Sequence, residues 1–301
     1  MDSHATTKRK KYRQLLESNK ILIGPGVYDG FSARLVEHLG FDSGFISGAG
    51  LSESALGISD VGIMGLDENL ARSRAMVNCT SIPLQADADT GYGNAVNVHF
   101  TVKNFEQSGV SGIMIEDQVW PKRCGHMKGK NVISIQEATQ KIRSAVEARE
   151  DPDFVIMSRT DSFATDGIEE VINRLKSFES VGADLLFADA LLSLNDMETV
   201  VKNISKPLAI NMGFGIRSRS TTPLISAQQL EDIGIAAVIY PRLLTGAALT
   251  GMKTALGILK ESIETKSLIE RPDLVSSFEE INSLTGIDML NELEERYSHT
   301  S

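Results

Sequence analysis

Short apolar runs alternate along the chain with segments whose apolar residues recur every three to four positions. The segments Asn97–Glu106 and Gln136–Glu147 show the second pattern clearly, and it is typical of helices with one buried face. The apolar runs are typical of strands that are buried on both faces. Eight runs are predicted as strands: Ile21–Gly24, Ser43–Ser47, Pro83–Ala86, Gly112–Glu116, Phe154–Arg159, Asp184–Ala188, Pro207–Asn211 and Ala236–Tyr240.

The regular alternation of strands and helical segments indicates a parallel sheet whose strands are joined by helices. Two architectures share this order, a closed (β/α)8 TIM-type barrel and an open, doubly wound sheet. The strand count is that of the barrel. The turn Gly24-Pro25-Gly26 after the first strand is also too short for a dinucleotide-binding loop, and it contains a proline. We therefore expect an α/β chain that forms a (β/α)8 barrel.

Two parts of the chain are expected to differ in role. Residues 1–265 should form the catalytic barrel, and residues 266–301 a C-terminal helical extension for oligomer contacts. Arg271-Pro272-Asp273 interrupts the helical pattern, and Ser276–Tyr297 is predicted as two short helices that meet near Gly286. The one basic run, at residues 8–13, is expected to be the solvated face of a first helix.

The composition of the chain limits the kinds of partner that the protein is expected to have. The 301 residues carry a net charge of −10, which argues against a nucleic-acid partner or an anionic membrane surface. No apolar stretch is long enough to span a membrane, and Met1-Asp2-Ser3-His4 lacks the apolar core of a signal peptide. Two cysteines, Cys79 and Cys124, do not make a disulfide framework. A cytoplasmic protein is therefore expected.

Acidic side chains follow two neighbouring strands. Asp87 and Asp89 come at the end of the third strand, and Glu116 ends the fourth. Each acid alone is equally consistent with a helix cap, but the strands of a barrel end at one rim, so the three are expected to lie close together. Carboxylate and water oxygens are the ligands that Mg²⁺ prefers. The sequence therefore predicts a Mg²⁺ site, in which Mn²⁺ can substitute, and no His/Cys set has zinc spacing.

Anion-binding groups follow other strands. Arg159 ends the fifth strand and suits a carboxylate, although a structural ion pair with a rim acid is the alternative. The glycine turn after the second strand offers backbone N–H groups to an anionic oxygen. Tyr28 or a rim carboxylate such as Asp60 is a candidate for removing a hydroxyl proton. Asn211 ends the seventh strand and is a further candidate for binding the substrate.

A long loop after the fourth strand carries Cys124. Its neighbours Lys122, Arg123 and His126 are basic, which favours a thiolate nucleophile or a thiol acid, and the alternative is an incidental thiol. Loops at this end of a barrel often cover the site and exclude water. Cys79 lies in an apolar context and is expected to pack in the interior.

These residues together resemble the isocitrate lyase / phosphoenolpyruvate mutase superfamily over nearly the whole chain. The Asp-x-Asp-Thr-Gly-Tyr-Gly and Lys-Arg-Cys-Gly-His pieces are highly specific in this order and spacing. The segments that carry the resemblance are Pro25–Asp29, Ser47–Gly50, Asp87–Gly93, Ile115–Gln118, Lys122–His126 and Arg159–Asp161.

The resemblance implies a role for each matching position. Asp87 would be the main protein contact to Mg²⁺, with Asp89 and Glu116 acting largely through water. Arg159 would bind the carboxyl group of the nascent fragment, and Cys124 would deliver a proton to the enolate that cleavage releases. The substrate would be held by Ser47, Gly48, Ala49, Arg159, Gly125, His126 and Asn211. The resemblance also implies a homotetramer, a dimer of dimers whose C-terminal helices swap between subunits.

The subgroup is less sharply indicated. Within the superfamily, the loop cysteine is found in lyases and is lacking in phosphoenolpyruvate mutases. Oxaloacetate hydrolases usually carry a serine where this chain has Pro241. With a proline at this position, the chain resembles the group formed by 2,3-dimethylmalate lyase, 2-methylisocitrate lyase and carboxyvinyl-carboxyphosphonate phosphorylmutase. Two features depart from the pattern. Asp189 stands where glutamate is common, and the loop Met212–Pro223 is longer and contains Arg217 and Arg219.

We therefore expect a Mg²⁺-dependent carbon–carbon lyase that cleaves a small 2-hydroxy di- or tricarboxylate, such as a 2,3-dialkylmalate or 2-methylisocitrate. The products would be a 2-oxo acid and a carboxylate. Oxaloacetate hydrolysis to oxalate and acetate, and carboxyvinyl-carboxyphosphonate phosphorylmutase activity, are the enzymatic alternatives. A barrel retained as a binding protein is the alternative without catalysis.

Overall fold

The computed structural model describes residues 3–125, 129–213 and 222–298. Eight parallel strands form a closed barrel in chain order, and β1 pairs with β8 through Leu22 and Ala237. The (β/α)8 prediction is therefore confirmed. The strands are β1 Leu22–Val27, β2 Gly44–Ile46, β3 Leu84–Asp87, β4 Gly112–Glu116, β5 Val155–Thr160, β6 Leu185–Ala188, β7 Leu208–Asn211 and β8 Ala237–Tyr240.

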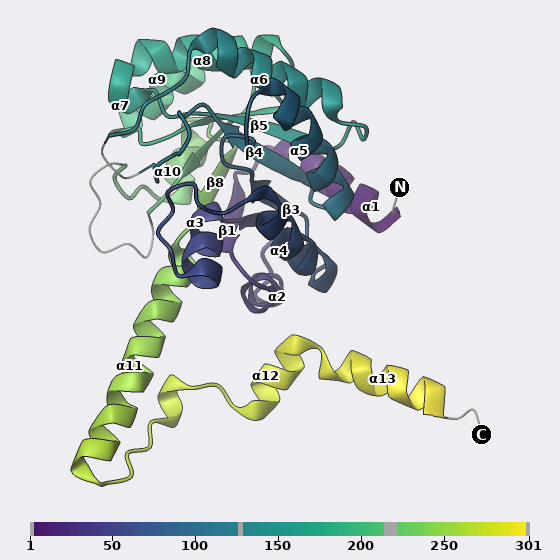
Figure 1. Cartoon of the computed structure of the whole chain (residues 1–301), viewed down its shortest axis with the longest axis vertical. Helices are drawn as coiled ribbons and strands as arrows, with labels where there is room; N and C mark the ends of the chain where they lie inside the picture. Colours follow the sequence, from purple (N-terminus) through teal and green to yellow (C-terminus); the bar gives the residue numbers. More distant parts are fainter. Residues whose placement is uncertain (1–2, 126–128, 214–221, 299–301) are drawn as a thin grey trace. The chain divides into compact units, whose positions relative to one another are not determined.

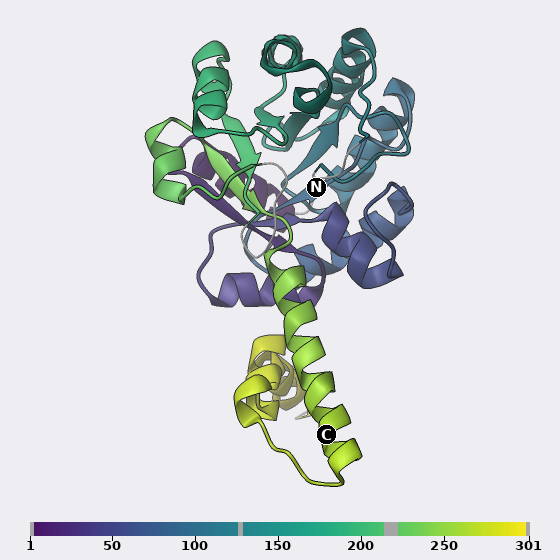
Figure 2. The same cartoon turned by 90° about the vertical axis from the view of Figure 1, so that its left-hand side faces the viewer.

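Helices cover the outside of the barrel (Figures 1 and 2). Several begin at a side-chain cap, as Ser134, Ser193 and Ser226 accept a backbone N–H three residues on. The helices of this unit are α1 Ser3–Leu16, α2 Gly30–His38, α3 Gly48–Leu51, α4 Leu66–Cys79, α5 Ala95–Ser108, α6 Ile135–Ala148, α7 Phe163–Asp166, α8 Ile168–Ser180, α9 Leu194–Asn203 and α10 Ala227–Asp232, with a π-turn at Ser52–Leu56.

The apolar core has two layers. One lies between the strands and the surrounding helices, where Phe105, Leu175 and Phe178 are fully buried. The other fills the barrel itself, and Tyr12 of α1 belongs to it together with Leu22, at the start of β1. Helix α1 therefore closes the end of the barrel where the strands begin. The opposite end, where the strands finish, remains for a functional site.

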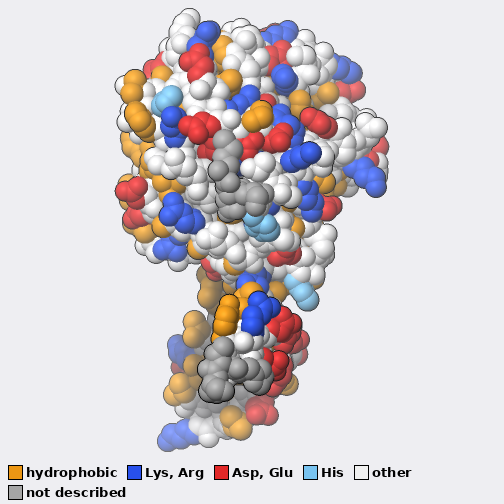
Figure 3. All heavy atoms as spheres, turned by 90° about the vertical axis from the view of Figure 1, so that its right-hand side faces the viewer, with side chains coloured by type: hydrophobic (Ala, Val, Ile, Leu, Met, Phe, Trp, Pro, Cys, Tyr) orange, Lys and Arg blue, Asp and Glu red, His pale blue; other side chains and the backbone are white. Residues whose placement is uncertain are grey.

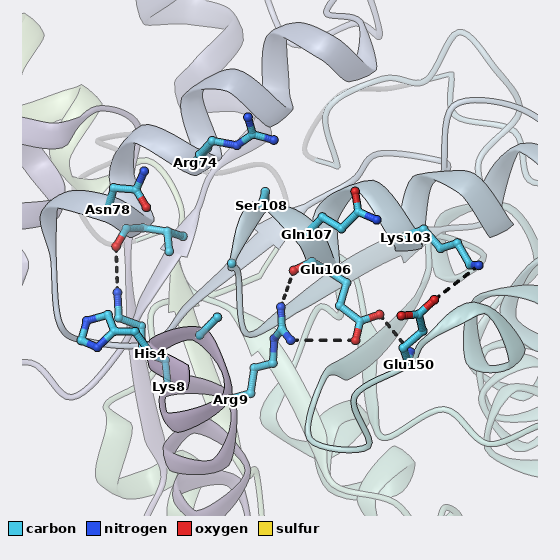
Figure 4. Close-up of a pocket in the computed structure, with 13 residues that line it drawn as sticks. His4, Lys8, Arg9, Arg74, Asn78, Lys103, Glu106, Gln107, Ser108 and Glu150 are labelled. Carbon is cyan, nitrogen blue, oxygen red and sulfur yellow. Dashed lines mark hydrogen bonds and ion pairs between the residues drawn. The ribbon is translucent and has the colours of Figure 1, made fainter. Parts of the chain in front are cut away.

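The expectation of a solvated first helix is wrong for Lys8 and Arg9, which are 4% and 3% exposed. Helices α4 and α5 end beside α1 and present backbone carbonyls that have no partner within their own helices. Lys8 Nζ donates to Val77 O at 2.7 Å and to Thr80 O at 2.6 Å (Figure 4). Arg9 donates to the carbonyl oxygens of Val110 and Glu106. Helix C-termini favour nearby positive charge, and this interaction accounts for the burial of Lys8 and Arg9.

The chain divides into two compact units, Met1–Leu244 and Thr245–Ser301. The division falls inside α11 (Leu243–Thr265), whereas the sequence pattern places the domain boundary after residue 265, at the end of this helix. The second unit continues with a 3₁₀ turn at Pro272–Leu274, α12 Phe278–Thr285 and α13 Ile287–Ser298. Gly286 ends α12 in the left-handed conformation, where the sequence predicts the junction of two helices.

The outer surface carries mixed charges. On the face shown in Figure 3, acidic and basic side chains are interspersed over the barrel unit. Among the described residues, no helix combines the length and the apolar character needed to cross a bilayer.

Arg9 offers a test of the buried charges at the closed end. The Arg9→Met substitution leaves Asp151, 3.0 Å from Arg9 Nη1, and Glu106 as buried acids without their cation. We expect the free energy of unfolding to fall by about 3–5 kcal/mol, the usual cost of breaking a buried ion pair. Denaturant titration measures it, and Lys11→Met is the control, because Lys11 is exposed and lies 3.8 Å from Asp42. Equal stability of the two variants would contradict this account.

Candidate active site

Polar side chains from most of the strand ends surround a cavity of about 40 Å³. Its floor is the apolar interior of the barrel, represented by Phe45, Met114, Phe187 and Ile239. The other lining residues come from the segments that follow the strands: Ser47, Ala49, Asp60, Asp87, Cys124, Gly125, Arg159, Asp189, Asn211, Pro241 and Arg242. Most residues that the sequence predicts for the site are thus in one place.

A larger cavity of about 450 Å³ lies beside α1 and the ends of α4 and α5 (Figure 4). Its cations already have partners: Lys8 and Arg9 bind helix carbonyls, and Lys103 lies 3.4 Å from Glu150 in an exposed pair. The only free cation among its described residues is Arg74, which is exposed. The smaller cavity is therefore the better candidate, because the buried acids Asp60, Asp87 and Asp189 and the thiol of Cys124 line it.

The acids of the predicted metal site are buried. Asp87 ends β3, and its Oδ1 accepts the backbone N–H of Asp89, which has a positive φ of 47°. Burial, opposed by Lys122 and helped by Asp89, raises the pKa of Asp87 from 3.8 to about 6. Burial also raises the pKa of Glu116 well above its ordinary value, although Arg159 opposes the rise. Each group thus lacks enough positive charge around it.

The ammonium group of Lys122 lies among these acids. Its Nζ forms an ion pair with Asp60 and lies 2.8 Å from Asp89 Oδ1. Burial lowers the pKa of Lys122, but Asp89, Glu116 and Asp60 raise it well above its ordinary value. Within the ranges that the structure describes, no three His, Cys, Asp or Glu side chains converge closely enough to hold a metal ion by themselves. Direct coordination by all three acids is thus not what the structure shows.

The same residues nevertheless suit a hydrated divalent ion. Among the described residues, Glu116 Oε1 is a buried oxygen without a hydrogen-bond donor. Asp89 Oδ1 has an ion-pair partner in Lys122 Nζ, 2.8 Å away, but no donor in hydrogen-bond geometry. Gly48 lies against Asp87, and an added Cβ there would be 2.7 Å from Asp87 Oδ2. A hard ion that retains several waters needs few direct protein ligands, and its waters supply donors to oxygens of this kind. One direct contact from Asp87 and water-mediated contacts from the others agree with this arrangement.

Arg159 is the centre of a network of acids. Its Nε and Nη2 donate to both carboxylate oxygens of Asp161, at 2.7 and 2.9 Å. Its Nη2 also lies 3.3 Å from Asp189, and its Nε 3.4 Å from Glu116. The sequence offered anion binding and a structural ion pair as alternatives, and the ion pair is present. In the described part of the chain Nη1 makes no hydrogen bond, so one edge of the guanidinium is left for a ligand.

Cys124 is 8% exposed and lies on the cavity wall. Its backbone N–H donates to Asp60 O at 3.1 Å, and Arg242 Nη2 lies 3.5 Å from its sulfur. Sequence reasoning missed Arg242, although it directly follows the eighth strand and Pro241, and the rule about strand ends applied to it. Gly125 continues the loop, and a Cβ added there would overlap Asp189 Oδ2. The described start of the loop therefore sits directly on the Arg159 network.

The remaining predicted residues differ in where the structure places them. Ser47 caps α3 by accepting the N–H of Gly50 at 3.1 Å, and Ala49 lines the cavity. Asn211 Nδ2 donates to Asp189 Oδ1 at 2.9 Å, so it fixes that carboxylate. Tyr28 does not line the cavity, and burial raises the pKa of its hydroxyl. His126, Arg217 and Arg219 lie outside the described residues.

The chain matches the family model described as phosphoenolpyruvate phosphomutase over residues 12–259. It is 38% identical to the 2,3-dimethylmalate lyase of Eubacterium barkeri, over 96% of this chain and 97% of the relative. Its fold is similar to oxaloacetate acetylhydrolase in complex with 3,3-difluorooxalacetate, with a TM-score of 0.90, 30% identity, and coverage of 98% of this chain and 99% of that one.

A third likeness concerns the metal. The structure of phosphonopyruvate hydrolase in complex with oxalate and Mg²⁺ is similar to this chain, with a TM-score of 0.83, 28% identity, and coverage of 96% and 99%. The family model, the relative and the two structures all describe enzymes. The chain therefore belongs to the phosphoenolpyruvate phosphomutase family, within the isocitrate lyase / phosphoenolpyruvate mutase superfamily of enzymes.

Proposed function

We propose that the chain is a Mg²⁺-dependent lyase that cleaves the C2–C3 bond of a small 2-hydroxy di- or tricarboxylate. Candidate substrates are a 2,3-dialkylmalate and 2-methylisocitrate. The observation that carries this proposal is that buried acids, an arginine edge and a buried thiol surround one cavity. A relative named for the cleavage of 2,3-dimethylmalate supports it. The proposed products are a 2-oxo acid and a carboxylate.

Asp87 would hold Mg²⁺, or Mn²⁺ in its place, directly, with Asp89 and Glu116 acting through water. When bound, the ion supplies positive charge that stabilises the oxyanions of substrate and product. When no ion is bound, the ammonium group of Lys122 neutralises Asp60 and Asp89 in its place. We place the reaction in the cytoplasm, in keeping with two cysteines that are both free.

Groups of the chain itself would bind the substrate and carry out the two proton transfers. Backbone N–H groups at Gly48 and Ala49 would bind one carboxylate, and Arg159 Nη1 the other. Asp60, which lines the cavity, is better placed than Tyr28 to take the hydroxyl proton. As the C2–C3 bond breaks, its electron pair passes to the leaving carboxylate fragment, and the Cys124 thiol donates a proton to that carbon. The proton taken from the hydroxyl balances the one that Cys124 gives up.

Access to the cavity requires the loop to move. About 40 Å³ accommodates a few water molecules, whereas a dicarboxylate needs several times that space. Gly125 and Cys124 close the cavity over Asp189 and Asp60. We therefore propose that the loop after β4 opens to admit substrate and closes to exclude water before the thiol acts.

Oxaloacetate hydrolysis is the second candidate, because a solved oxaloacetate acetylhydrolase is similar over nearly the whole chain. Pro241 lines the cavity and provides no hydroxyl there, which favours the lyase. Purified protein with Mg²⁺ should be incubated with dialkylmalates, 2-methylisocitrate and oxaloacetate, while 2-oxo acid and oxalate are measured. Formation of oxalate from oxaloacetate, with no 2-oxo acid from the hydroxy acids, would replace the lyase by the hydrolase. Carboxyvinyl-carboxyphosphonate phosphorylmutase activity remains the third candidate.

We further propose a homotetramer, a dimer of dimers, whose contacts use the C-terminal helices. Leu249, Met252, Leu256, Leu259 and Ile263 are all more than half exposed and recur every three to four residues along α11. Such a stripe of exposed apolar side chains is a surface that another chain can cover. We expect light scattering to give the mass of four chains, and Leu256→Asp to reduce it. A wild-type monomer would contradict the proposal.

Replacement of Cys124 by alanine tests the proton donor. We expect kcat to fall by about 10²–10⁴-fold, the usual contribution of a general acid, while KM stays within a few-fold, because the anion-binding groups are intact. The matched control is Cys79→Ala, since Cys79 lies at the end of α4 and bonds only backbone carbonyls. Steady-state kinetics with the best substrate provide the measurement. Unchanged turnover in Cys124→Ala would refute the role.

Metal affinity should depend on pH through Asp87. Its pKa of about 6 means that a proton competes with the ion below that value. We expect Mg²⁺ affinity to fall about tenfold per pH unit below pH 6 and to level off above it. In the metal-free protein the same carboxyl stabilises the fold below its unfolded pKa near 3.8, and this contribution is lost as pH rises through about 6. Calorimetric titration from pH 5 to 8 measures the affinity, with Asp87→Asn as the non-binding reference; a flat profile would rule the coupling out.

A further inference from the structure

Lys130 is a buried lysine that has no role in the proposed reaction. It lies after Gly129, on the arm of the loop that returns from Cys124 towards α6, and its side chain is 2% exposed. Backbone hydrogen bonds hold this arm to the outgoing arm: Val119 N donates to Asn131 O at 2.8 Å, and Ile133 N donates to Asp117 O at 2.9 Å. The position of Lys130 is therefore set by the loop, although its ammonium ends among residues of the barrel.

The ammonium of Lys130 and the guanidinium of Arg159 bind the same two carboxylate oxygens. Asp161 Oδ1 accepts from Lys130 Nζ at 2.8 Å and from Arg159 Nη2 at 2.9 Å. Asp189 Oδ2 lies 3.2 Å from Lys130 Nζ and 3.3 Å from Arg159 Nη2. The two cations thus alternate with two anions in a closed ring of four charges.

Both partners on the Asp161 side of this ring are ionised. Burial by itself raises the pKa of Asp161, but Arg159 and Lys130 outweigh it and hold the value well below the ordinary range. Burial lowers the pKa of Lys130, but Asp189 and Asp161 outweigh it and raise the value. Lys130 and Asp161 are therefore full charges in a dry environment, where each charge acts strongly on its neighbours.

The charge around Arg159 depends on Lys130. Three acids face the guanidinium, namely Asp161, Asp189 and Glu116. With Lys130 present, two cations oppose Asp161 and Asp189, the two acids that both cations contact. Without it, the arginine alone would face both, and the excess negative charge would repel an anionic ligand at the free Nη1 edge.

We infer that Lys130 is a positioning residue for substrate binding: by sharing Asp161 and Asp189 with Arg159, it keeps the guanidinium in place and leaves its outer edge able to bind a carboxylate. Because Lys130 belongs to the loop that carries Cys124, the same contact places the thiol-bearing loop and strengthens the anion site together. This inference rests on the proposed function only in taking Arg159 as the group that binds a substrate carboxylate.

Lys8 provides a matched comparison. It is also a buried lysine, with 4% of the whole residue exposed against 6% for Lys130, and its Nζ donates to the backbone carbonyls of Val77 and Thr80. Its partners are helix carbonyls at the closed end of the barrel. If each lysine only stabilises the fold, Lys8→Met and Lys130→Met should both lose thermal stability and keep anion binding. If Lys130 supports the anion site, weaker anion binding should appear only in Lys130→Met.

The experiment measures calorimetric binding of oxalate to the full chain in the presence of Mg²⁺, together with KM and kcat. Oxalate is the probe because it is a small dianion that a similar structure holds with Mg²⁺. The proteins are wild type, Lys130→Met, Lys130→Arg, Lys8→Met and, as the reference without the anion grip, Arg159→Met. Thermal unfolding of each protein is recorded in parallel.

We expect Lys130→Met to bind oxalate at least tenfold more weakly and to raise KM by a similar factor, with Lys130→Arg restoring most of the affinity. Lys8→Met should keep wild-type affinity while losing thermal stability. Wild-type affinity and KM in Lys130→Met would overturn the inference and leave Lys130 a stabilising residue only. If the wild type binds oxalate but cleaves no hydroxy acid, the proposed function fails while Lys130 is still tested. A wild type that binds no oxalate would overturn both.

Discussion

Burial of more negative than positive charge at the ends of the strands is the constraint on which the rest of this site depends. Among the described residues, the carboxylates that gather there include Asp60, Asp87, Asp89, Glu116, Asp161 and Asp189. In the described part of the chain the cations that contact them are Lys122, Lys130 and Arg159. Buried acids retain a charge only when cations or donors compensate them. The raised pKa of Asp87 and of Glu116 shows where compensation is incomplete, and there a divalent ion would add most.

The two ends of the barrel solve opposite electrostatic problems. At the end closed by α1, helix carbonyls are in excess, and Lys8 and Arg9 satisfy them. At the open end, acids are in excess, and two of the three cations come from the loop after β4. Cations on the barrel framework would be fixed, but cations on a loop arrive with it. Closure of the loop would therefore deliver the thiol of Cys124 and the charge of Lys122 and Lys130 at the same time.

This arrangement explains why glycine and small side chains border the site. Gly125 lies so close to Asp189 and Arg159 that any side chain there would displace the loop. Gly48 leaves the Asp87 carboxylate uncovered in the same way. Close approach of backbone to charged groups is thus a requirement of the site rather than of the barrel, whose own packing relies on large apolar residues such as Phe105 and Phe187.

The sequence by itself determined the barrel and the composition of its rim. Apolar runs at regular spacing fix the strands, and whatever follows each strand must lie at the same end, so Asp87, Glu116, Arg159 and Cys124 were predictable. Only the tertiary structure decided which charges meet. The basic run at residues 8–13 has the pattern of a solvated helix, yet Lys8 and Arg9 are buried, because distant helices end beside them. Lys130 and Arg242 likewise carry no local signal of their partners, since those contacts join loops that are far apart in the chain.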